Sequence, residues 1–95
     1  MNLQEFKNSI SNENPPENIS DVLKALWFEK KGEWKAAHEI AQTEKTLSHD
    51  LIHAYLHRVE GDNGNANYWY NRAKREMPKL SLNEEWEKMV DEFLK

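Results

Sequence analysis

Histidine is the residue type in this chain best suited to metal or acid–base chemistry. His53 and His57 lie four residues apart in the segment HAYLHR, with His49 four residues earlier and Glu60 three residues later. Side chains at positions i and i+4 share one face of a helix, so two imidazoles at this spacing can bind one ion. Zinc requires a third protein ligand, which His38 or Glu60 could supply if the fold brings them close. His49 cannot join His57, because eight residues span about 12 Å of helix.

A surface location is the competing interpretation of these histidines. The zinc-protease pattern H-E-x-x-H is absent, because Ala54 occupies the position of the glutamate that would act as the base. On a helical wheel the apolar residues of this helix occupy one arc, and the histidines lie opposite. We therefore predict no metal and no cofactor, and we keep His53 and His57 as candidate metal ligands.

No other motif predicts catalysis. A glycine-rich phosphate loop and the nucleophile motif G-x-S-x-G are both absent, and a chain without cysteine has no thiolate chemistry, disulfide or cysteine-ligated zinc. We assign no catalytic residue. A non-enzymatic protein is the favoured interpretation, and enzymatic activity is left open.

Charge and hydropathy exclude two further classes of partner. The net charge of -4 opposes the phosphate neutralisation on which nucleic-acid binding depends. No apolar run approaches the roughly 20 residues that a membrane span requires, and the first residues, MNLQEFKNSI, lack a signal-peptide pattern. We expect a cytoplasmic protein without a nucleic-acid or membrane partner.

The spacing of apolar residues predicts an all-α fold of about six helices in a single domain, residues 1–95. The chain has only three glycines and three prolines, and no long alternation of apolar and polar residues. Capping patterns predict helix starts at Asn2, Ser20 and Ser81. The predicted segments are an N-terminal helix (2–11), a proline-containing linker (12–19), a first helical hairpin (20–46), a second hairpin ending at Pro78 (47–78) and a C-terminal helix (81–95).

An internal repeat relates the two predicted hairpins. A shift of 29 residues aligns VLKALWFEKKGEWKAAHEIAQ with LIHAYLHRVEGDNGNANYWYN. Three small residues of the first segment then coincide with three of the second: Ala25 with Ala54, Gly32 with Gly61 and Ala37 with Ala66. The shared pattern A-x6-G-x4-A, with GEW and GDN at the turns, resembles the tetratricopeptide repeat (TPR), although the offset is shorter than the usual repeat of about 34 residues. The resemblance covers residues 20–78 and implies two helix-turn-helix repeats in a right-handed superhelix, flanked by the outer helices.

The segments ALWFEKKGEWKAAHEIAQ, HAYLHRVEGD and NANYWYNRA also resemble those of a group of small bacterial proteins, which implies the fold but no activity. The repeat aligns His57 with Phe28 and His53 with Lys24. Because Phe28 points away from the main apolar arc of its helix, we predict that His57 is partly buried and that His53 meets water. A partly buried imidazole needs hydrogen-bond partners, for which the candidates are Tyr68, Tyr70, Asp62 and Asn65.

The TPR resemblance implies a module that binds a protein or peptide, with a homodimer as one form. The candidate binding residues are His53, His57, His38, Tyr68, Arg72 and Trp27. Among them, Tyr68 and Arg72 are four residues apart and are predicted to form an exposed pair. The alternative, from another class, is a small-ligand or metal-dependent protein with a histidine-rich pocket. Distances among the three histidines in the folded chain distinguish the two hypotheses.

Overall fold

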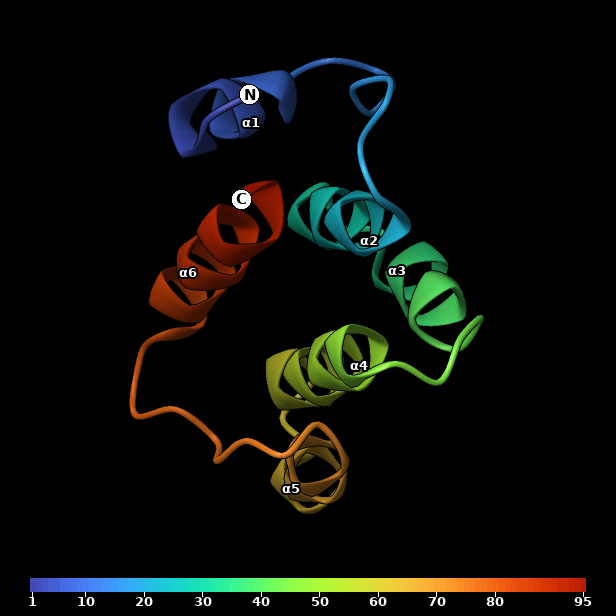
Figure 1. Ribbon diagram of the computed structural model, residues 1–95, viewed down its shortest axis with the longest axis vertical. Coiled ribbons are helices and arrows are strands. Elements are labelled where there is room, and N and C mark those ends of the chain that lie inside the picture. The colour runs from blue at the N-terminus through green and yellow to red at the C-terminus, as the bar shows by residue number, and fades with distance from the viewer.

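The computed structural model describes all residues, 1–95, and confirms the all-α prediction with six helices (Figure 1). None of the helices has both the length and the apolar composition that a bilayer crossing demands. The helices are α1 (Leu3–Ser9), α2 (Asp21–Lys30), α3 (Trp34–Ala41), α4 (Leu47–Val59), α5 (Asn63–Arg72) and α6 (Leu82–Leu94).

The helix starts follow the capping residues that the sequence contains. The side chain of Asn2 accepts from the backbone of Glu5 while the Glu5 carboxylate accepts from Asn2, and Ser81 and Glu84 form the same reciprocal pair at α6. Ser20 caps α2 through the backbone N–H of Leu23. These three predicted caps are confirmed, and each satisfies a donor that would otherwise have no partner at a helix end.

Two helical hairpins, α2–α3 and α4–α5, turn at glycines. Gly32 and Gly61 have φ values of +87° and +85°, a conformation that glycine adopts without a steric penalty. The residue after each glycine donates its N–H to a carbonyl five residues back, Phe28 or His57, which closes the end of the helix. Both hairpins therefore have the turn that the repeat pattern predicts.

The second hairpin ends earlier than predicted. Helix α5 stops at Arg72 rather than running to Pro78, and Lys74 adopts a positive φ of 61°. The N–H of Arg75 bonds to the carbonyl of Tyr70, the same closing bond that follows each of the two glycines. Helix α3 likewise ends at Ala41, short of the predicted boundary. The predicted helix end at Pro78 was wrong because Lys74 occupies the position with positive φ that follows the helix. Glycine usually occupies that position, so the lysine gave no signal for the end of α5.

A single cluster of buried apolar side chains joins the hairpins to the outer helices. The small residues of the repeat, Ala25, Ala37, Ala54 and Ala66, are fully buried where helices approach closely. Helix α6 packs on α2, on the side away from α3 (Figure 1), and the Trp86 indole N–H donates to the carbonyl of Leu26 at 3.0 Å. The C-terminal helix thus covers the core on one side of α2, and α3 covers it on the opposite side.

Candidate metal centre

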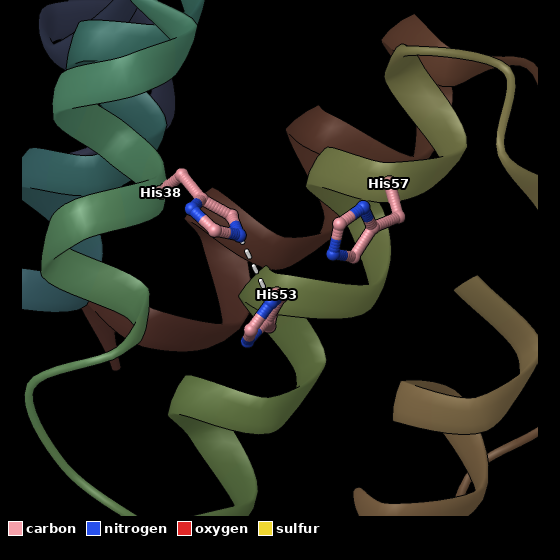
Figure 2. Close-up of side chains that lie close together, drawn as sticks. All are labelled: His38, His53 and His57. Carbon is pink, nitrogen blue, oxygen red and sulfur yellow. Dashed lines mark hydrogen bonds between the residues drawn. The ribbon is translucent and has the colours of Figure 1, made fainter. Parts of the chain in front are cut away.

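Three histidines from neighbouring helices converge on one point. His38 lies on α3, while His53 and His57 lie four residues apart on the same face of α4 (Figure 2). The Nε2 atoms of His38 and His53 are 3.0 Å apart, and the ring centroid of His57 lies 5.4 Å and 4.9 Å from those of His38 and His53. One ligand atom from each residue lies within 4.8 Å of the other two. The fold therefore supplies the third imidazole that a zinc ion requires.

Two tryptophans flank the imidazoles. The ring of Trp34 stacks on His38 at a centroid distance of 4.7 Å, and the ring of Trp69 stacks on His53 at 3.8 Å. The Trp34 indole N–H donates to the carbonyl of Leu56 at 2.8 Å, which fixes the position of this ring against α4. The indoles cover two sides of the cluster and restrict the rotamers of the histidines they contact.

The prediction that His53 meets water is wrong, since only 5% of its surface is exposed. The helical wheel and the alignment of His53 with Lys24 describe one helix at a time. In the folded chain Trp69 arrives from α5 and His38 from α3, and together they cover an imidazole that the wheel of α4 alone leaves in solvent. His49 is also buried, which the wheel did not predict.

The predicted burial of His57 is confirmed, with 8% of the residue exposed. Its hydrogen-bond partner is none of the predicted ones. The Nδ1 atom of His57 lies 2.6 Å from Oε2 of Glu60, which follows it by three residues at the end of the same helix. Glu60 therefore belongs to the candidate site as the hydrogen-bond partner of His57.

Burial, together with the nearby imidazoles of His38 and His57, lowers the pKa of His53 to about 4. The pKa of His38 is also lowered, mainly by burial and next by His57, against the opposing effect of Glu60 and Glu39. Both rings are therefore neutral at pH 7, and one Nε2–H donates to the other Nε2 across their 3.0 Å contact. A metal cation would take the place of that shared proton.

Tyr68 and Arg72 lie beside this cluster, at the surface. Tyr68 is 53% exposed, and a guanidinium N–H of Arg72 donates to its hydroxyl at 3.4 Å, so the predicted exposed pair is confirmed. Arg72 also lies over the ring of Trp69, 5.2 Å from its centroid. A cleft of about 330 Å³ adjoins His53 here and is lined by Ala41, Gln42, Glu44, Lys45, Asp50, His53, Trp69 and Arg72.

Trp27, the remaining predicted binding residue, is fully buried in the core. Its indole N–H donates to the hydroxyl of Ser9 at 3.2 Å, which ties α2 to α1. The structure therefore separates Trp27 from the histidines and from the surface.

Sequence reasoning missed the two tryptophans that flank the site. The spacing of Trp34 and His38, four residues on one helix, is a local signal for their stacking. No local signal pairs Trp69 with His53, because the two residues belong to different helices and meet only when α5 folds back on α4.

A second polar cluster surrounds His49 at the start of α4. Its Nε2 faces Oδ2 of Asp21 at 2.9 Å and Oε2 of Glu44 at 3.4 Å, and its Nδ1 lies 2.7 Å from the hydroxyl of Thr46. Both ring nitrogens thus have protein partners, and the two carboxylates are largely exposed. We interpret this cluster as the set of hydrogen-bond partners that a buried histidine requires.

Comparison of the chain with protein-family models, with curated proteins and with solved structures found no match to any of them.

Proposed function

We propose that this protein binds a late first-row transition metal ion, with Zn²⁺ as the reference ion, through His38, His53 and His57. The observation that carries the proposal is the convergence of three imidazoles from two helices, with their ligand atoms within 4.8 Å of one another. Convergence of this kind is what the metal hypothesis required, and helical spacing alone provides only two of the three donors.

The donor set supports this class of metal. Three imidazole nitrogens suit Zn²⁺, Cu²⁺ and Ni²⁺, whereas Mg²⁺ and Ca²⁺ prefer oxygen ligands. The lowered pKa values of His38 and His53 keep these rings in the neutral form that coordinates a metal.

The spacing of the donors also fits. With Zn–N bonds of 2.0–2.1 Å, two ligands of a tetrahedral ion lie about 3.3 Å apart, close to the 3.0 Å between the His38 and His53 nitrogens. The ligand atom of His57 lies within 4.8 Å of the other two, so it would approach them by at most about 1.5 Å. Three protein ligands leave the fourth tetrahedral position for water or another exchangeable ligand.

We rank metal binding above the peptide-binding role predicted from the TPR resemblance. Helix α6 covers one side of α2, and its residues bond to α4 through the pairs Tyr55 with the Leu82 carbonyl and Arg58 with Glu85. The chain's own C-terminal helix thus occupies surface that a bound helix would use. The TPR-like character of the hairpins is part of our proposal and is supported by the two glycine turns.

Calorimetric titration of Zn²⁺ into chelator-treated protein tests the proposed function. We expect one ion per chain, and a loss of affinity of at least about tenfold when His38, His53 or His57 is replaced singly by glutamine. His49→Gln is the matched control, because it removes the fourth histidine and leaves the cluster intact. The proposal fails if wild-type protein binds no zinc, or if His49→Gln removes binding while the other three variants retain it.

A further inference from the structure

The ring of His57 is held by a carboxylate at the end of its own helix. Glu60 is the C-cap residue of α4, and its backbone conformation (φ -81°, ψ 0°) closes the last turn. Its Oε2 lies 2.6 Å from Nδ1 of His57. The histidine side chain is 10% exposed and the glutamate side chain 42% exposed, so a buried ring is oriented by a group that reaches solvent.

We infer that Glu60 is a positioning residue of the proposed metal centre, which holds His57 as the Nδ1–H tautomer so that Nε2 is the ligand atom. This inference rests on the proposed function. An ionised carboxylate only accepts hydrogen bonds, so the short contact requires the proton on Nδ1. A neutral imidazole then has its one lone pair on Nε2. Figure 2 shows the tip of the His57 ring directed toward His38 and His53.

Glu60 distinguishes His57 from the other two ligands. The Nε2 atoms of His38 and His53 share a proton, so one of these rings must change its tautomer before both can coordinate an ion. Neither of their Nδ1 atoms has a protein partner comparable to Glu60. His57 is therefore the ligand already set in its coordinating form, and a carboxylate behind a metal-bound histidine also raises the basicity of the ring.

An alternative use of the same carboxylate is direct coordination, since Asp62 lies close to His57 and Glu60. Two observations oppose it. The 2.6 Å contact has the length of a charge-assisted hydrogen bond, shorter than the roughly 3.3 Å between two ligands of a tetrahedral ion. The Asp62 carboxylate is already engaged, because its Oδ1 accepts from the backbone N–H of Asn65 at the start of α5.

Zinc affinity and the His57 tautomer can be measured on the same variants. We expect Glu60→Ala to weaken zinc binding about 10- to 100-fold in a competition with a chromophoric chelator. Glu60→Gln retains an acceptor oxygen but not the charge, so its affinity falls between those of wild type and Glu60→Ala. Glu39→Ala is the matched control: it removes an exposed carboxylate beside His38 that has no hydrogen bond to a ligand, and its affinity stays at the wild-type value.

Two-bond ¹H–¹⁵N correlation spectra of the metal-free protein provide the second readout, which a merely structural role of Glu60 would not change. Wild type shows His57 with its proton on Nδ1, and Glu60→Ala shifts the population toward Nε2–H. Zinc binding by wild type with unchanged affinity in Glu60→Ala, or an unchanged His57 tautomer in that variant, overturns this inference alone. Absence of zinc binding in the wild type overturns the proposed function together with it.

Discussion

The imidazole of His53 is in contact with the indole of Trp69 and the ring of His38. Burial at this position disfavours the protonated, charged form of the ring. In the unfolded chain the same ring has the ordinary histidine pKa of 6.5, whereas folding lowers it to about 4. Between these two values the unfolded state binds a proton that the folded state does not. The protein without metal must therefore lose stability as the solution is acidified.

We predict that the free energy of unfolding of the metal-free protein falls as the pH is lowered from about 6.5 toward 4, and that the contribution of His53 levels off below that range. The sign follows from the lowered pKa, since protons favour the state that binds more of them. Urea denaturation at several pH values, in the presence of a chelator, measures this slope. His53→Gln, which cannot be protonated, has a shallower slope, and an equal slope in the variant would contradict the prediction.

At the residue scale, the sequence predicted which two histidines share a face better than it predicted how deeply each is buried. The four-residue spacing of His53 and His57 placed both rings on one face, and the alignment with Phe28 correctly indicated that His57 is buried. The burial of His53 depends on Trp69, which approaches from another helix. Helical periodicity describes one element at a time and has no information about such a contact.

Among the helix ends, Gly61 provides a direct test of the turn geometry. We predict that Gly61→Ala destabilises the protein by about 1–2 kcal/mol, because an alanine at φ +85° has the Cβ penalty of the left-handed conformation. No atom lies within 4 Å of the added methyl, so the cost is conformational and not steric crowding.

Gly64→Ala is the control for that substitution. Gly64 lies within α5, has no positive φ and also has open space around its Cβ position, so alanine should stabilise the protein by about 0.5 kcal/mol. Thermal or chemical denaturation of both variants gives the two signs. Destabilisation by both substitutions would contradict this interpretation of the α4–α5 turn.

Three helices meet at the carboxylate of Glu85. This buried side chain of α6 accepts from the Arg58 guanidinium of α4 at 2.6 Å and from the Tyr70 hydroxyl of α5 at 2.6 Å. Arg58 also donates to the carbonyl of Leu80 in the segment before α6. This network of buried hydrogen bonds fixes the position of α6 against the second hairpin.

We predict that Arg58→Met destabilises the protein by about 3 kcal/mol, because it leaves the Glu85 carboxylate buried with only Tyr70 as partner. The matched control is Lys7→Met, which breaks the exposed pair between Lys7 and Glu87 and should cost at most about 1 kcal/mol. Both values come from chemical denaturation. Equal losses in the two variants would show that burial of the Glu85 pair has no special weight.

The ends of the helices show what local sequence can predict. The caps at Asn2, Ser20 and Ser81 and the turns at Gly32 and Gly61 follow from side-chain chemistry within a few residues, and all were predicted. The end of α5 was not, because Lys74 takes a left-handed conformation that lysine rarely adopts. Lysine gives no local signal for that conformation, because glycine is the residue that usually adopts it at the end of a helix.

For the molecule as a whole, the histidine cluster connects the two hairpins. His38 belongs to the first hairpin, and His53 and His57 belong to the second, so a shared ion would join them across the five-residue connection between α3 and α4. Coordination would therefore constrain the arrangement of the hairpins relative to each other.

We predict that zinc stabilises the folded protein by mass action, by about 2.7 kcal/mol at a free concentration one hundred times Kd. For a domain of this size each kcal/mol raises Tm by roughly 4–8 °C. Thermal denaturation with increasing Zn²⁺ measures the shift, and His53→Gln is expected to show little of it. A shift of equal size in that variant would mean that the stabilising ion binds elsewhere.

At this scale the fold class, the number of helices and the pairing of helices into hairpins could be predicted from apolar spacing and from the repeat. The placement of α6 against α2, and with it the burial of Trp86 over Leu26, could not. These residues are separated by 60 positions, and their contact depends on how the whole chain closes. The histidine cluster shares that limitation, since His38 reaches α4 only through the packing of one hairpin on the next.

Trp34 and Trp69, which flank the imidazoles, also give the site an optical signal of its own. They are two of only four tryptophans, and the other two, Trp27 and Trp86, are buried in the core on other side chains. A paramagnetic ion such as Cu²⁺ or Ni²⁺ in the cluster would lie beside the Trp34 and Trp69 rings, which stack on His38 and His53, and would quench their fluorescence. Occupancy of the site can thus be followed in the unmodified protein, without a label.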